Sequence, residues 1–180
     1  IRADLLAYAD KRREVIKLAG DAQHLSKRAI FALQRDNAVE AAESLTKAQS
    51  LLGQLTKKYA KDVRIFDEGS FKAALEEFSE ATLFKQFLDG KEVGEIKAFK
   101  LGSDAYISGL CDVPGEIVRY AIKSATERNF KMVKHCYAVA EAIVSALVDM
   151  DLTGYNRQKF DQAKQALSKA QQIVYEVSLK

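Results

Sequence analysis

Four carboxylates stand in two pairs whose spacing suits metal-assisted chemistry. Glu77 and Glu80 are three residues apart in "EFSEATLFKQFL", and Asp112 and Glu116 are four apart in "GLCDVPGE". Side chains three or four apart lie on one face of a helix, so each pair points in one direction. Two neighbouring helices can therefore offer four oxygen ligands to one cavity. Such ligands suit Mg²⁺ or Mn²⁺, which hold phosphates and polarise water for attack on phosphorus.

The first acidic pair interrupts a helix face that is otherwise apolar. On a helix, Glu77 and Glu80 share one side with Ala73, Phe84 and Phe87. Burying a lone carboxylate is costly, and an unpaired one takes up a proton. A divalent cation or a basic partner removes that cost, so the pattern indicates one or the other at this place.

Three ordinary explanations compete with a metal site. A run of charges on a helix, here residues 76–80, is usually a solvated face. Asp112 can cap a helix that restarts at Val113 and Pro114, because proline is well tolerated in a first turn. Glu116 and Arg119 can be a surface ion pair three residues apart. Spacing alone leaves these alternatives open.

Other chemistries lack their sequence patterns. Neither His24 nor His135 follows a glutamate by three residues, as di-iron bundles require, and the chain has no glycine-rich phosphate loop and no zinc spacing. We expect both histidines on helix surfaces. Cys111 and Cys136 stand in apolar helical patterns, which predicts buried free thiols. Free thiols favour a reducing, intracellular setting, and we expect a cytoplasmic protein.

A mostly basic stripe runs along the first predicted helix, at steps of three and four. Its members are Arg13, Lys17, Gly20, His24, Lys27, Phe31 and Arg35. A stripe of this length matches the repeat of phosphates along a nucleic acid better than it matches a small ligand. No base-reading motif accompanies it, so backbone contacts would dominate. The alternative is a solvated face whose charges pair with nearby acids or with another subunit.

The elements that must position these side chains are helices. The chain has 180 residues, of which 48% are hydrophobic and 29% charged, with nine glycines and one proline. Helical periodicity runs almost throughout, which predicts a single domain over residues 1–180, an all-α antiparallel bundle of about six helices. No apolar run is long enough for a membrane span. We expect the helices at about 3–35, 38–60, 66–89, 103–126, 129–150 and 156–179.

Three segments together resemble one known family. "DKRREVIKLAGDAQHLSKRAIFALQR", "EFSEATLFKQFL" and "YISGLCDVPGEIVRY" look like the first-, third- and fourth-helix signatures of translin-associated factor X, a branch of the translin family. The similarity extends over essentially the whole chain, to the closing "KAQQIVYEVSLK". It implies a translin-like bundle of six to seven helices that assembles into octameric shells around RNA or single-stranded DNA.

The resemblance also assigns roles to the acidic residues. Glu77, Glu80 and Asp112 match the branch's catalytic carboxylates, and Glu116 matches the glutamate that follows. Asp112 is the residue that separates the nuclease branch from translin itself, which lacks the acidic set. Pro114 departs from the family, which more often has a small hydroxyl or aliphatic residue there. The chain is also shorter than its eukaryotic relatives, which implies a compact, self-assembling form that need not have a separate translin subunit.

We therefore expect a Mg²⁺- or Mn²⁺-dependent endoribonuclease that cleaves short RNA inside a homo-oligomeric shell. Its four carboxylates would hold the cation, and Arg119 would steady charge beside them. The residues expected to face RNA are Arg13, Lys17, Lys27 and Arg35, with Arg119 at the site itself.

Two alternatives remain at this point. One is a translin-like shell that binds RNA or single-stranded DNA without cleaving it. The other is a nucleoside triphosphate pyrophosphohydrolase of the MazG type, whose Glu-Glu-x-x-Glu pattern fits "EEFSE" with Glu76 in the site. The second motif of those enzymes, Glu-x-x-Asp, is not matched by Asp112 and Glu116.

Overall fold

The computed structural model describes residues 1–99 and 101–179, and over these residues it contains seven helices and no strand. The helices are α1 (Arg2–Gln34), α2 (Ala38–Lys58), α3 (Val63–Phe66), α4 (Gly69–Leu88), α5 (Ser103–Thr126), α6 (Phe130–Val148) and α7 (Gly154–Ser178). The prediction of an all-α bundle is confirmed. Lys100, in the expected irregular connection, and Lys180, at the end of the predicted domain, lie outside the described residues.

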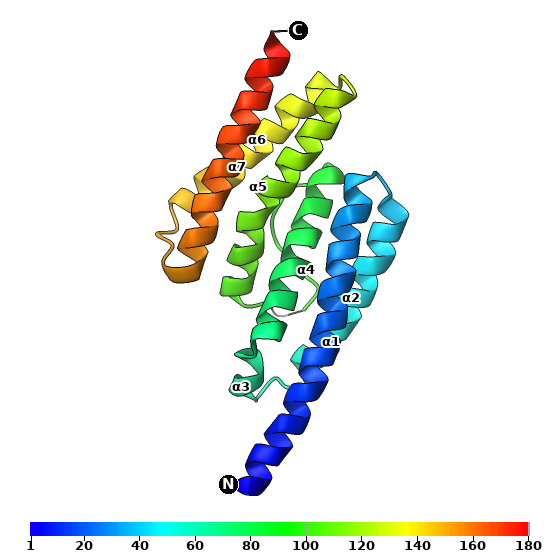
Figure 1. The fold of residues 1–180 in the computed structure, drawn as a ribbon, viewed down its shortest axis with the longest axis vertical. Helices are drawn as coiled ribbons and strands as arrows, with labels where there is room; N and C mark the ends of the chain where they lie inside the picture. Colours follow the sequence, from blue (N-terminus) through cyan, green and yellow to red (C-terminus); the bar gives the residue numbers. More distant parts are fainter. Residues whose placement is uncertain (100, 180) are drawn as a thin grey trace.

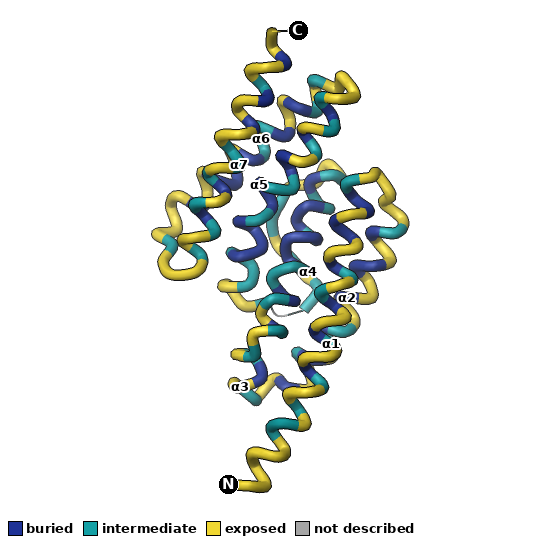
Figure 2. Tube along the Cα trace, in the orientation of Figure 1, coloured by how far each residue is buried: buried dark blue, intermediate teal, exposed yellow. Residues whose placement is uncertain are grey.

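The helices form two groups that meet at α4 and α5. Helix α1 packs on α2 and α4, α4 packs on α5, and α5 packs on both α6 and α7. The two chain ends lie at opposite ends of the molecule, where the start of α1 and the end of α7 extend beyond the other helices (Figure 1). These projecting turns are largely exposed, whereas α4 and α5 carry long buried stretches (Figure 2). Positions on α4 and α5 are therefore the most sheltered in the fold.

Polar residues at the turns explain where several helices begin and end. Asn37 accepts a hydrogen bond from the Glu40 N–H at 3.2 Å, and Asn129 accepts one from the Met132 N–H at 3.1 Å, so each caps its helix. Helix α4 ends just before Gly90, whose φ of 68° is the left-handed conformation that glycine adopts without strain. The expected end of this helix is confirmed.

The starts of the later helices agree only in part with the expected ranges. Helix α5 begins at Ser103, as expected, with Gly102 in the capping position and no capping hydrogen bond from a side chain. Helix α7 begins at Gly154 and not at residue 156, because the φ of 56° at Gly154 turns the chain directly into the helix. The connection between α2 and α4 contains the short helix α3. The sequence did not predict this helix, because four residues are too few to show helical periodicity.

Pro114 lies inside α5, which runs without a break from Ser103 to Thr126. The helix does not restart at Val113, so the prediction that Asp112 caps a new helix is wrong. A proline within a helix removes one backbone hydrogen bond and bends the axis. The burial of Val113, Pro114 and Ile117 in the core offsets the free-energy cost of the lost hydrogen bond.

At Gly109 the backbones of α4 and α5 approach closely. A Cβ atom at this position would lie 2.5 Å from Ser79 Cβ, 2.8 Å from the Glu76 carbonyl oxygen and 2.8 Å from the Glu80 backbone nitrogen. Only glycine permits this approach of the two backbones. The contact brings Glu76 and Glu80 of α4 beside the turn of α5 that carries Asp112.

The predictions for the two cysteines and the two histidines are confirmed. Cys111 and Cys136 are buried free thiols, and desolvation raises the pKa of Cys136 to about 12. His24 and His135 are exposed, and the His135 ring stacks on Phe87 with centroids 5.4 Å apart. Among the described residues, no helix is long and apolar enough to cross a membrane.

Candidate active site

The four predicted carboxylates lie close enough to influence one another's ionisation. Glu80 of α4 is surrounded by the charges of Asp112, Glu77 and Glu116. Glu77 and Glu80 come from one face of α4, and Asp112 and Glu116 come from the facing side of α5. None of the four is fully exposed, so the alternative of a solvated helix face is wrong. We call these four residues the acidic pocket.

Glu80 is the most buried member of the acidic pocket, with 9% of its surface exposed. Among the described residues no side chain donates a hydrogen bond to its carboxylate or pairs with it. Desolvation raises the pKa of Glu80 to about 9, and the negative charges of Asp112, Glu77 and Glu116 add to that rise. Without a further positive charge, Glu80 is therefore protonated at neutral pH.

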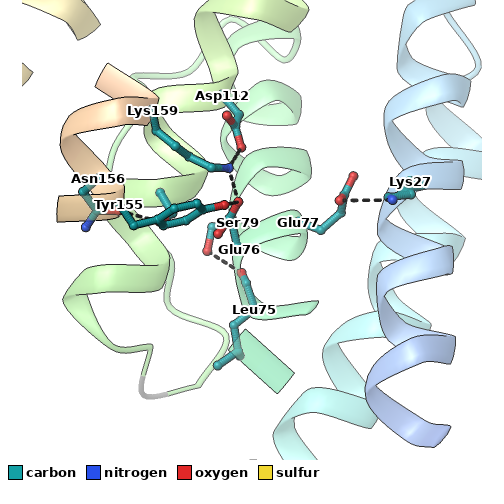
Figure 3. A network of polar contacts seen from close by, with 10 residues as sticks. Lys27, Leu75, Glu76, Glu77, Ser79, Asp112, Tyr155, Asn156 and Lys159 are labelled. Atoms are coloured by element: carbon teal, nitrogen blue, oxygen red, sulfur yellow. Dashed lines mark hydrogen bonds and ion pairs between the residues drawn. The ribbon is translucent and has the colours of Figure 1, made fainter. Parts of the chain in front are cut away.

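Glu77 connects the acidic pocket to the basic face of α1. Lys27 Nζ lies 3.8 Å from Glu77 Oε2 (Figure 3). Burial nevertheless outweighs this cation and raises the pKa of Glu77 above its ordinary value. The pocket thus lies directly beside the helix that carries the basic stripe.

Glu116 is held in place from α1. The Gln34 side-chain amide donates hydrogen bonds of 2.9 Å to both Oε2 and the backbone carbonyl of Glu116. Arg119 Nη1 lies 3.3 Å from Glu116 Oε1, and most of the Arg119 side chain is exposed. The surface pair that spacing predicted is therefore present, and Arg119 stands at the rim of the pocket. Nothing in the sequence pattern indicated the contribution of Gln34.

Asp112 is bound to a lysine that sequence reasoning missed. Lys159 of α7 donates hydrogen bonds to Asp112 Oδ2 and to Glu76 Oε1, and the Tyr155 hydroxyl donates to the same Glu76 oxygen at 3.2 Å (Figure 3). Burial raises the pKa of Asp112, and the bond from Lys159 opposes that rise. Burial also opposes the charge on Lys159, but the two carboxylates outweigh it and raise the pKa of the ammonium group.

A signal for this contact was present in the sequence but could not be interpreted alone. Tyr155 and Lys159 are four residues apart and therefore share one face of α7. Many helices carry such pairs on open surface. Only the packing of α5 against α7 shows that this face meets Asp112. Ser108 and Asn156 join the same two helices through a hydrogen bond of 2.6 Å.

The ligand atoms that the acidic pocket offers are those that a hard divalent cation prefers. All four candidate ligands are carboxylates. Buried Glu80 forms no ion pair within the described part of the chain, and the charge of Lys159 only partly offsets its burial, a cost that a bound cation would remove. The side chains are not arranged as a finished site, since no three His, Cys, Asp or Glu side chains of residues 1–99 and 101–179 are placed to hold one ion. The Lys159 ammonium group lies against Asp112 instead.

The basic stripe of α1 lies on the surface, as predicted. All seven of its members are exposed. Arg13 pairs with Asp10 and Lys27 with Glu77, whereas Lys17 and Arg35 form no ion pair within the described residues. The stripe is therefore partly self-neutralised, and two of its cations are available to a ligand.

A cavity of about 580 Å³ lies beside the acidic pocket, between α4 and the first turns of α5 and α7. Glu76 and Tyr155 form part of its wall, so they separate it from Lys159 and Asp112. Leu75, Ala105 and Phe66 supply apolar surface. Its volume lies within the usual range for small-ligand sites.

Comparison with known proteins gives a family and a fold. Residues 10–180 match the model of the Translin family. Over 99% of this chain and 95% of the other, the crystal structure of AfC3PO has a TM-score of 0.91 at 24% identity. The AfC3PO–duplex RNA complex gives 0.89 at 23% identity, covering 99% and 94%, and apo-NeC3PO gives 0.89 at 17%, covering 98% and 94%. No curated protein sequence matches the chain.

Proposed function

The chain belongs to the translin family, and from this membership and its acidic pocket we propose that it is a divalent-cation-dependent endoribonuclease of the translin-associated factor X type. The observation that carries the proposal is the burial of Glu80 among three further carboxylates. A protein that only binds RNA gains nothing from four acids in a sheltered pocket, because they repel phosphate. Because the chain belongs to the translin family, we also prefer this proposal to the alternative of a MazG-type pyrophosphohydrolase.

In this proposal Glu77, Glu80, Asp112 and Glu116 hold a Mg²⁺ or Mn²⁺ ion. The ion supplies positive charge for a phosphodiester and activates water for its hydrolysis. The protein's own residues orient the carboxylates: Gln34 fixes Glu116, and the contact at Gly109 sets the distance between α4 and α5. Arg119, at the rim, is placed to neutralise charge on the phosphate that is cleaved.

RNA would approach along the exposed face of α1. Arg13, Lys17, Lys27 and Arg35 lie on that face, and Lys27 is also in contact with the acidic pocket. The similarity of the fold to AfC3PO, one structure of which contains duplex RNA, supports RNA as the ligand. A path from Arg13 to Lys27 would bring a strand bound by its phosphates to the carboxylates.

The first experiment is an RNA cleavage assay. Purified protein is incubated with a labelled single-stranded RNA of a few tens of nucleotides in Mg²⁺, in Mn²⁺ and in EDTA, together with Asp112→Asn. The matched control is Asp161→Asn, which removes a partly exposed aspartate of α7 that pairs with Arg157 and Lys164. We expect metal-dependent cleavage by the natural chain and the control, and a loss of at least about a hundredfold in Asp112→Asn.

Asp112→Asn is expected to fold and to bind RNA normally, because Asp112 lies within a continuous helix and caps nothing. Salt-sensitive RNA binding without cleavage under any condition would reject the nuclease and support the non-catalytic shell. Equal loss of cleavage in Asp161→Asn would show that the assay reports folding and not the site.

A further inference from the structure

Lys159 is a cation enclosed among the acids of the candidate site. Its side chain is 12% exposed, and its ammonium group contacts carboxylates from two different helices, Glu76 of α4 and Asp112 of α5. Lysine is rarely buried unless its charge is paired. Here the pairing also serves the acids, because one positive charge is shared between two of the carboxylates that crowd this region.

The two partners of Lys159 differ in what else holds them. Glu76 also accepts the Tyr155 hydroxyl, and the Tyr155 ring centroid lies 5.4 Å from the Lys159 nitrogen, within range of a cation–π contact. Lys159, Glu76 and Tyr155 therefore form a set that persists without Asp112. The contact to Asp112 is the one that Lys159 can lose while its charge stays compensated.

Two positive groups compete for the carboxylate of Asp112, namely the proposed cation and the ammonium group of Lys159. Asp112 is the ligand that joins α5 to the proposed cation, yet one of its oxygens, Oδ2, bonds to the ammonium group. A divalent cation on the same carboxylate would stand within a few ångströms of Lys159, and like charges at that distance repel strongly where water is scarce. The absence of three converging acidic side chains in the described residues agrees with a pocket that this lysine holds in another arrangement.

We propose that Lys159 is an exchangeable counter-ion of the acidic pocket. Resting on the proposed function, the inference is that the ammonium group neutralises Asp112 until a divalent cation binds. It then releases Asp112 and stays on Glu76 beside Tyr155. Lys159 thereby stabilises the pocket when no metal is bound and weakens the binding of a divalent cation. Because Lys159 belongs to α7, its release from Asp112 also couples cation binding to that helix.

The test measures Mn²⁺ binding directly and does not depend on RNA cleavage. Free Mn²⁺ is followed by electron paramagnetic resonance during titration of the natural chain, Lys159→Met and Lys159→Arg. We expect Lys159→Met to bind Mn²⁺ about tenfold or more tightly, because it removes both a competitor and a repelling charge. Lys159→Arg, which keeps the charge, is expected to stay near the natural value.

Lys123→Met is the matched control. Lys123 is also half-buried and paired with an aspartate, Asp36, but lies eleven residues further along α5 than Asp112. Its loss should leave Mn²⁺ binding unchanged. In EDTA, Lys159→Met should melt below the natural chain, because removing one partner leaves buried acids uncompensated. Saturating Mn²⁺ should shrink or reverse that difference.

Two outcomes would overturn the proposal. Equal or weaker Mn²⁺ binding by Lys159→Met rejects the exchange but leaves the proposed nuclease intact, whereas the absence of Mn²⁺ binding by every protein rejects both. If Lys159→Met does not fold, Glu76→Gln decides, because it removes the group that receives Lys159. The proposal then requires weaker Mn²⁺ binding than in the natural chain, and unchanged binding contradicts it.

Discussion

Single glutamates in this chain respond to their surroundings in opposite ways. Burial among other acids raises the pKa of Glu80, whereas a hydrogen bond from Lys58 lowers the pKa of Glu14 below its ordinary value of 4.5. Both residues lie within long helices. Their local sequence gives no indication of the difference, since Lys58 is 44 residues from Glu14.

Glu14 provides a prediction about pH. It accepts hydrogen bonds from Lys58 Nζ at 2.6 and 2.7 Å and from the Tyr59 hydroxyl at 2.6 Å, and so ties α1 to the end of α2. A carboxyl group with a lowered pKa stabilises the fold above its unfolded-state pKa and loses this effect as the pH falls through the folded-state value. The contribution of Glu14 is therefore present at pH 7 and disappears in acid.

We expect Glu14→Gln to lower the free energy of unfolding at pH 7 by roughly 0.5–1 kcal/mol, a small value because the pair is partly exposed. The difference should be smaller at pH 3 than at pH 7, because the charge of Glu14 is progressively lost in acid. Urea unfolding followed by circular dichroism at both values measures it. Glu43→Gln, at an exposed position of α2, is the control and should change little. A deficit that persists undiminished in acid would assign the effect to packing.

At the scale of elements, the site depends on how closely α4 and α5 approach. The helices themselves follow from periodicity and from capping residues such as Asn37 and Asn129. Their contact at Gly109 does not, because a glycine within a helical pattern is also compatible with a simple loss of stability. Its role becomes clear only from the backbone of α4 that lies against it.

Gly109→Ala is expected to destabilise the protein by about 1–3 kcal/mol, because the new methyl group would meet backbone atoms of Glu76 and Glu80 that cannot turn away. Gly115→Ala in the same helix is the control. No atom lies within 4 Å of its added Cβ, so alanine should stabilise α5 by about 0.5–1 kcal/mol. Thermal unfolding of both variants measures this, and equal effects would refute the close-contact argument.

At the scale of the whole molecule, opposite charges are segregated onto neighbouring surfaces. The basic stripe covers the exposed face of α1, and the acidic pocket lies behind it between α4 and α5. Lys27 joins the two through Glu77. This arrangement separates a surface that attracts phosphates from a pocket that requires a cation to receive one.

The double variant Lys17→Glu with Arg35→Glu tests this surface. Both side chains are exposed and form no ion pair among the described residues, so the fold should be unaffected. RNA affinity should fall, and the slope of log K against log salt should become shallower by about 1.5–2 units. Fluorescence anisotropy at several salt concentrations measures both quantities. The control, Lys47→Glu with Lys131→Glu on α2 and α6, should retain the natural slope; equal losses would indicate a net-charge effect only.

Self-association is the second prediction at this scale. The projecting start of α1 exposes Leu5 and Leu6, and at the opposite end of the molecule Tyr175 of α7 and Leu179, which follows this helix, are exposed. Exposed apolar residues of this kind are candidates for a protein–protein contact. We expect light scattering to give a mass several times the 20.0 kDa of one chain. A mass of one chain at micromolar concentration would refute the proposed shell.

The sequence alone determined the class of fold, six of the helices to within a few residues, the exposure of the α1 stripe and the identity of the candidate carboxylates. These depend on periodicity and on neighbours three or four residues apart, which a single helix already contains. The four carboxylates remain predicted ligands until a cation is bound to them.

Only the tertiary structure decided what those carboxylates face. It placed Glu80 in the interior, excluded a helix cap at Asp112, and brought in Gln34 from α1 and both Tyr155 and Lys159 from α7. These hydrogen bonds join residues that are 47 to 83 positions apart in the sequence. The charge of a site is set by all the groups that surround it, and the sequence pattern of one helix cannot specify which helices pack against it.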